Sequence, residues 1–259
     1  MDATVLWVSH LGLLFTRNAA VFTVSPVLGR NNVPLYTKIL LSVLLTFIMI
    51  PLYPPPAEMD YGSIFHYTFA ILGEAVLGLI IGYMNTLFFS VAFTAGQQID
   101  MKIGFGMVQV YDVQSNVQVP VAGSLLNLII LLVFLLADGH IRLIQALSRT
   151  FEVIPVGQVA LNADIAFVVV ESFARAFAIA VNIAIPLIAA GLLAEAALGV
   201  IVRTTPQINV FVLGIPIKLL IGLFILFLIM PIFVNFTGVI FDEMFYAIDE
   251  IFQVLAGPG

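Results

Sequence analysis

The sequence contains no cysteine, and this absence excludes disulfide bonds, thiolate metal sites and cysteine nucleophiles. It has only three histidines, which lie in different segments without the HExxH spacing of zinc enzymes, so we expect no metal site. Paired catalytic acids, a nucleophile elbow and a glycine-rich phosphate loop are also missing. We therefore predict that the protein is not an enzyme and that it uses no cofactor.

Charged side chains are scarce as well. They make up 9% of the 259 residues, the net charge is -6, and no basic cluster occurs, so nucleic acid is not an expected partner. The start of the chain has no basic stretch, and Arg17 interrupts the first apolar run. For these two reasons we expect no cleaved signal peptide.

Hydrophobic residues dominate what is present. They make up 62% of the chain, which is more apolar surface than one water-soluble core can cover, so lipid or other subunits must cover the rest. Uncharged runs at 39–53, 75–96 and 121–137 are long enough to cross, or nearly to cross, a hydrocarbon layer about 30 Å thick. The composition predicts an all-α membrane protein.

Glycine, proline and polar residues divide the chain into about six long hydrophobic helices, arranged as helical hairpins within a single domain over 1–259. We expect the helix around Pro186 to be kinked, because proline lacks the N–H of the helical ladder. The predicted elements are a helical hairpin over 4–53, a long helix over 64–98, a loop over 99–121, helices over 122–155, a kinked helix over 165–202, a helix over 210–236 and an amphipathic C-terminal helix over 237–255.

The segment 99–121 suits neither water nor lipid. Gly104 and Gly106 interrupt its backbone, whose unsatisfied polar groups are costly in hydrocarbon, yet its content of Phe, Met and Val is high for a solvated loop. A loop enclosed by protein, or one that closes a cavity, resolves this conflict. An amphipathic connector on the protein surface is the alternative, and the residues by themselves favour that plainer interpretation.

Two further features point to close helix contacts. Gly78 and Gly82 have the GxxxG spacing, which serves packing either within this chain or against another subunit. Around residue 206, a polar stretch either ends a helix or forms an interface.

Residue order then suggests a family. Gly104-Phe105-Gly106-Met107, Asp112, Gln114-Ser115, Gln118-Val119-Pro120-Val121, Leu126-Asn127-Leu128, Asp138-Gly139-His140 and 151–155 together resemble the FliR family of flagellar export-gate proteins. The stretch 203–211, followed by Gly214 and Pro216, resembles the second signature of that family. Val113 and Asn116 depart from the pattern, where proline and glycine are expected, and this affects only the stiffness of the loop.

The resemblance implies a hetero-oligomer in the bacterial inner (cell) membrane, at the flagellar basal body. Its partners would be two small export-gate membrane subunits, the export switch protein, membrane lipid and unfolded secreted protein substrates that pass through a shared pore. By the same resemblance, the loop over 99–121 plugs the pore, with Phe105 and Met107 as sealing residues. The implied plug residues are Gly104, Phe105, Gly106, Met107, Val108, Gln109, Asp112, Gln114, Ser115, Gln118 and Pro120, and the implied packing or interface residues are Gly78, Gly82, Arg203, Pro206, Gln207, Asn209 and Phe211.

Alternative functions remain open at this point. The same resemblance also fits a virulence type III secretion subunit. The broken helices near Pro186 and Pro216, with Glu195 or Lys218 as a coupling residue, would suit a secondary transporter. A scaffold without a gating role is a third possibility.

Overall fold

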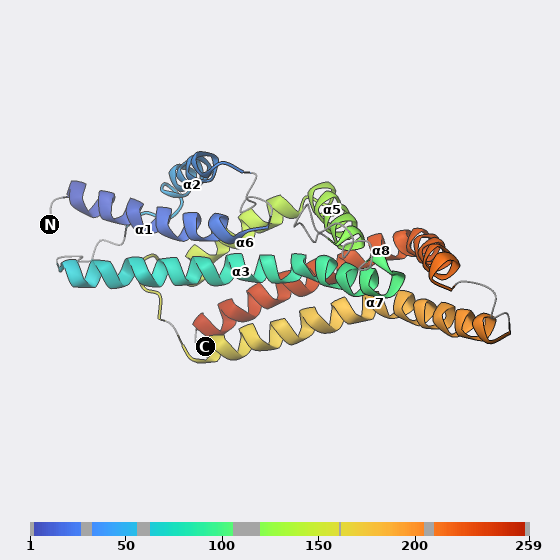
Figure 1. The fold of residues 1–259 in the computed structure, drawn as a ribbon. Coiled ribbons are helices and arrows are strands. Elements are labelled where there is room, and N and C mark those ends of the chain that lie inside the picture. Colours follow the sequence, from blue (N-terminus) through green and yellow to red (C-terminus); the bar gives the residue numbers. More distant parts are fainter. Residues whose placement is uncertain are drawn as a thin grey trace. The chain divides into compact units, whose positions relative to one another are not determined.

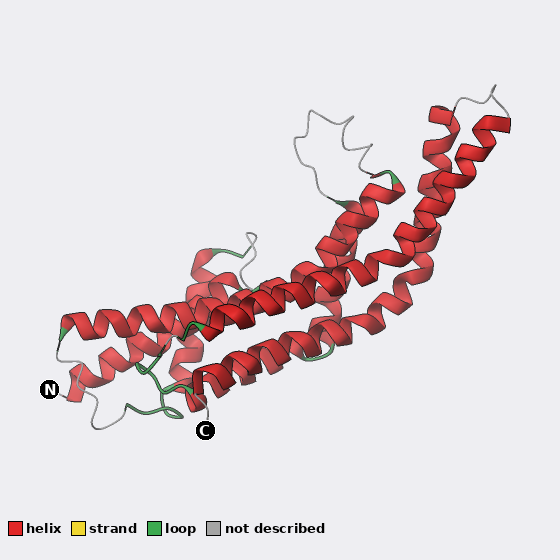
Figure 2. Cartoon of the chain, turned by 90° about the horizontal axis from the view of Figure 1, so that it is seen from below, coloured by secondary structure: helices red, strands yellow, loops and turns green. Residues whose placement is uncertain are grey.

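The computed structural model describes residues 3–26, 33–55, 63–105, 120–160, 162–204 and 210–256 (Figure 1). Figure 2 shows that most of these residues are helical, with short stretches of loop next to the helix ends. Four of the helices are long and apolar enough to cross a membrane, which confirms the predicted all-α membrane class. In chain order the helices are α1 (Ala3–Val24), α2 (Leu35–Met49), α3 (Ile64–Ile103), α5 (Val121–Leu136), α6 (Gly139–Val153), α7 (Asp164–Thr204) and α8 (Val210–Ala256).

The helices form two compact units. Unit 1 consists of Met1–Leu87, Asp138–Phe173 and Asp242–Gly259, and unit 2 consists of Phe88–Ala137 and Ala174–Phe241. Three helices, α3, α7 and α8, therefore contribute one part to each unit.

Three helices are longer than the sequence predicted. The helix α8 is continuous from Val210 to Ala256, where the pattern predicted separate helices over 210–236 and 237–255. The change from an apolar to an amphipathic pattern suggested a boundary there, but the helix continues past Pro231, and Thr237 donates its hydroxyl to the carbonyl of Val234 within the helix. The helix α7 runs from Asp164 to Thr204 and contains Pro186, where the pattern predicted a kinked helix over 165–202.

The helix α3 also continues beyond residue 98, to Ile103, so that the loop predicted over 99–121 begins later. Its extra turn is held by contacts with other helices of unit 2, which no local pattern reveals. Asp138 separates α5 from α6. Its φ of 54° lies in the left-handed region, so the two helices do not continue into each other.

Unit 1 is built on a close approach of α1 to α3, which run alongside each other in Figure 1. A Cβ atom on Gly78 would lie 2.6 Å from the carbonyl oxygen of Arg17, and one on Gly82 would lie 2.8 Å from that of Val21. The GxxxG glycines thus face α1 of the same chain. Their lack of a side chain lets the two backbones touch.

Unit 2 is centred on three phenylalanines from three helices. The ring of Phe134 on α5 lies edge-on to that of Phe89 on α3, with 5.0 Å between centroids, and 5.3 Å from that of Phe241 on α8. Phe89 and Phe241 are 6.0 Å apart. Edge-to-face arrangements of this kind add to the apolar burial that joins the helices.

We predict that Gly78→Ala destabilises the protein. Its methyl group would meet the backbone of α1, so the two helices must separate, at a cost of about 1–3 kcal/mol. The detergent-extracted protein should unfold several degrees lower in a thermal scan followed by circular dichroism. Gly199→Ala on α7 is the matched control, because no atom lies within 4 Å of a Cβ there. Equal melting of the two variants would contradict the prediction.

Candidate functional site

The implied plug residues fall only partly within the described residues. Gly104, Phe105 and Pro120 lie within them, whereas Gly106, Met107, Val108, Gln109, Asp112, Gln114, Ser115 and Gln118 lie outside. Gly104 has a φ of 97° and ends α3, with its N–H donated to the carbonyl of Asp100 at 3.2 Å. A Cβ on Gly104 would meet nothing within 4 Å, so backbone conformation, and not crowding, accounts for the glycine.

Asp100 joins the end of α3 to the start of α5, the two helices that flank the loop predicted to act as a plug, which we call the plug loop. This residue of α3 is 3% exposed, and its carboxylate oxygens accept the N–H of Ala122 at 3.0 and 3.1 Å. Ala122 lies in the first turn of α5, whose N-cap residue, Pro120, has no side chain that can cap the helix. Asp100 therefore caps α5 from another helix, and its negative charge suits the positive end of the helix dipole.

Glycines bring the same two helices into direct backbone contact. A Cβ on Gly96 of α3 would lie 2.2 Å from the Cα of Gly123 on α5. On the other side of this contact, a Cβ on Gly123 would lie 3.1 Å from the carbonyl oxygen of Phe93. Together with the Asp100 cap, this packing makes the base of the plug loop a fixed structure within unit 2.

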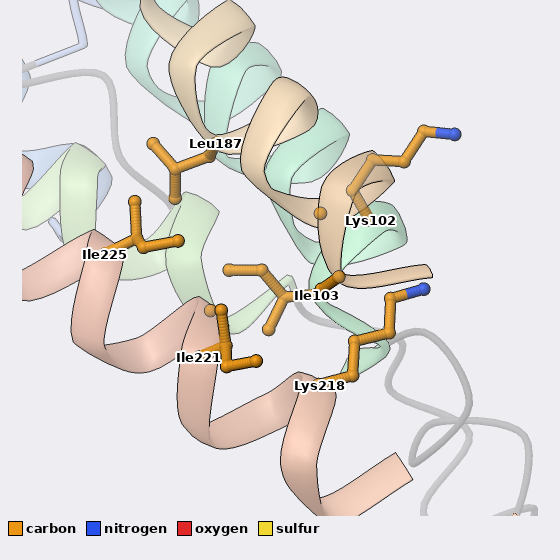
Figure 3. Close-up of a pocket in the computed structure, with 9 residues that line it drawn as sticks. Lys102, Ile103, Leu187, Lys218, Ile221 and Ile225 are labelled. Atoms are coloured by element: carbon orange, nitrogen blue, oxygen red, sulfur yellow. The ribbon is translucent and has the colours of Figure 1, made fainter. Parts of the chain in front are cut away.

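The last turn of α3 is inserted between α7 and α8. We call Lys102 and Ile103 the wedge. A Cβ on Gly222 of α8 would lie 2.3 Å from Cγ2 of Ile103, and one on Gly191 of α7 would lie 3.4 Å from Cβ of Lys102. Figure 3 shows Ile103 pointing between α7 and α8, while the amino groups of Lys102 and Lys218 point away from the apolar residues. A cavity of about 10 Å³ remains beside the wedge, which is the space of roughly one water molecule.

The two ionisable residues that suggested a transporter, Glu195 on α7 and Lys218 on α8, pair with each other. The Nζ of Lys218 donates to Oε1 of Glu195, within unit 2. A pair of opposite charges is the expected arrangement for ionisable groups on apolar helices.

A second polar cluster is buried in unit 1. Arg17 on α1 and Glu74 on α3 are fully buried and form a two-pronged ion pair, with N–O distances of 2.5 and 3.1 Å. Arg17 also donates to Thr150 and to the carbonyl of Ile154, at 3.0–3.1 Å, and Glu74 accepts the N–H of Gly157 at 2.7 Å. Removing one partner of such a pair costs about 3–5 kcal/mol, because the other charge is left buried and unpaired, so the two residues depend on each other.

A tyrosine hydroxyl joins the turn after α2 to α6 in the same unit. The Tyr53 O–H lies 3.0 Å from the carbonyl oxygen of Ser148 and 3.1 Å from the carboxylate of Glu152. A tyrosine hydroxyl is protonated at neutral pH and so can donate here, and burial raises the pKa of the Tyr53 hydroxyl further above its ordinary value.

The remaining sequence-based residues lie at the end of α7 and the start of α8. Arg203 is exposed in the last turn of α7. Phe211 belongs to the first turn of α8, but its side chain lies outside the description, as do Pro206, Gln207 and Asn209 altogether.

Sequence reasoning missed the roles of Asp100 and Arg17. Arg17 is the one charge in the apolar stretch over 3–24, and that isolation was the available signal. Asp100 lies beside Gln97, Gln98 and Lys102, where a charge does not stand out. Their partners, however, lie 22 and 57 residues away, so no local pattern names them.

We predict that Asp100→Ala loosens the base of the plug loop, because the first turn of α5 loses its cap. The expected loss of stability is about 1–2 kcal/mol, with a smaller loss for Asp100→Asn, whose amide oxygen can still accept one N–H. Hydrogen exchange of the Ala122 amide, followed by mass spectrometry, measures the effect. Unchanged protection in Asp100→Ala would contradict the assigned role.

Comparison with known proteins places these features in a family. The sequence model of the bacterial export proteins, family 1, matches residues 8–244. The flagellar biosynthetic protein FliR of Bacillus subtilis (strain 168) is 32% identical over 223 residues, 85% of each chain. FliR of Escherichia coli (strain K12) is 29% identical over 252 residues, 96% of each chain, and FliR of Aquifex aeolicus (strain VF5) is 28% identical over 229 residues, 88% of this chain and 86% of the relative. The resemblance predicted from the residues is confirmed, and the chain belongs to the bacterial export proteins, family 1, together with the FliR proteins.

Proposed function

We propose that this chain is a non-enzymatic subunit of the flagellar type III protein export gate in the bacterial inner membrane. The observation that carries the proposal is a family match over nearly the whole chain, to relatives named flagellar biosynthetic proteins. The apolar helices support the membrane location, since four are long enough to span it.

The proposal includes a pore shared with unlike partners, namely the two small export-gate subunits and the export switch protein. Its support is the surface of α7 and α8 in unit 2, where most apolar side chains are exposed. Glu195 lies among them with 46% of its side chain exposed, which would be costly against lipid. Protein partners, or a water-filled path that they enclose, can cover such a mixed surface.

The plug loop supplies the closing element of this proposal. Its ends are held by Asp100 and by the glycine contact between α3 and α5, so the loop starts and finishes at one fixed base. Its Phe and Met side chains would seal the pore by burying apolar surface, at about 25 cal/mol per Å². Such a seal is firm enough to stop ions, yet it can be displaced by an unfolded polypeptide.

The assembly is testable by co-purification. Gently extracted protein should carry unlike chains and show a native mass well above its 28.1 kDa. A monomer or a symmetric homo-oligomer would instead indicate an independent transporter.

In the source organism, deletion of the gene should abolish motility and flagellin secretion, and a motile deletion strain would contradict the flagellar assignment.

The plug is testable by permeability. We expect that removing residues from the plug loop between Gly104 and Val117 makes cells leak ions, because the apolar seal is lost. Phe105→Ala combined with Met107→Ala should produce a weaker leak. Co-purification of the partners with each variant shows that assembly is intact. Unchanged permeability in a fully assembled deletion variant would remove the plug from the proposal and leave a scaffold role.

A further inference from the structure

An ion pair joins α7 to α8 beside the wedge. Lys218 lies one helical turn before Gly222 on α8, and Glu195 lies one turn after Gly191 on α7, so the charges and the glycine contacts occupy the same helix faces. The Lys218 ammonium donates to the Glu195 carboxylate, and Lys102 of the wedge acts on that carboxylate electrostatically. The carboxylate of Glu195 is thus paired with Lys218 of α8, and Lys102 of α3 adds a weaker electrostatic attraction.

The exposure of this pair sets it apart from the ion pair in unit 1. The side chains of Arg17 and Glu74 are 0% exposed, so separating them would leave buried, uncompensated charges. Lys218 is 17% exposed and Glu195 is 46% exposed, so surrounding water or polar groups can take over when the two separate. The first pair is permanent by this criterion, whereas the second can open and close.

The wedge is in contact with both α7 and α8. Ile103 is 2% exposed and packs against Gly222 of α8, while Lys102 packs beside Gly191 of α7. An interaction that keeps α7 against α8 thus also keeps the wedge in place.

We propose that the Glu195–Lys218 ion pair is a releasable latch that holds α7 against α8 and thereby retains the wedge. Gly104 follows Ile103 directly. By retaining the wedge, the latch therefore fixes the position at which the plug loop begins. The inference rests on the proposed function, since it gives Glu195 and Lys218 a positioning role for the plug and not a role in ion coupling.

The absence of cysteine allows a single reporter thiol. Ile103→Cys places it on the buried wedge, and its labelling rate with N-ethylmaleimide is measured on membranes that contain the full chain in its assembly. Adding Glu195→Gln or Lys218→Gln should raise the rate about fivefold, the factor that corresponds to about 1 kcal/mol. The double variant should raise it no further, because the two residues act as one pair.

Arg142→Gln is the matched control, since it breaks an exposed ion pair with Asp242 in unit 1 and should leave the labelling rate at the Ile103→Cys reference. The latch is wrong if either single variant also stays at the reference rate, or if the two single effects multiply in the double variant.

Permeability of the same strains separates this inference from the plug. If the ion-pair variants raise the labelling rate as expected while cells with the shortened loop do not leak, the latch is supported and the plug is contradicted. If cells with the shortened loop leak while the ion-pair variants leave the labelling rate unchanged, the plug is supported and the latch is contradicted.

Discussion

Arg17 places a charge in the interior of unit 1, and the surrounding helices are arranged so that each of its N–H groups has an acceptor. A guanidinium has five N–H donors, and five hydrogen bonds leave Arg17, to Glu74, Thr150 and Ile154. The ring of Phe151 lies 4.3 Å from its central carbon. Any shift of α1 relative to α3 or α6 would leave a donor or a charge unpaired, so this requirement fixes their register.

Charged side chains on the helices of unit 2 also need partners, and Asp100 and Glu195 have partners of different kinds. Asp100 is satisfied by the backbone N–H of Ala122 at the start of α5, and Glu195 is satisfied by Lys218 on a neighbouring helix. These charges therefore define contacts between helices. Ionisable residues on apolar helices invite a transport mechanism, but a structural pairing accounts for the ones described above.

Glycine determines where the helices approach and polar groups determine how they align. In unit 1, Gly78 and Gly82 let α3 touch α1 beside the Arg17 cluster. In unit 2, Gly96 and Gly123 let α3 touch α5 beside Asp100, and Gly222 receives Ile103. Each contact combines a small residue, which lets a neighbouring backbone or, at Gly222, a side chain approach closely, with a nearby polar bond that selects one register.

The sequence by itself determined the features that depend on composition and local order. The apolar runs identified a helical membrane protein, the motifs around Gly104 and Pro120 identified its family, and GxxxG marked a close helix contact. Tertiary structure alone decided that Arg17 pairs with Glu74, that Asp100 caps α5, and that α8 continues to Ala256. A hydropathy pattern reports how each residue relates to its near neighbours, whereas an ion pair or a cap is defined by a partner that only the folded chain brings within 3 Å or so.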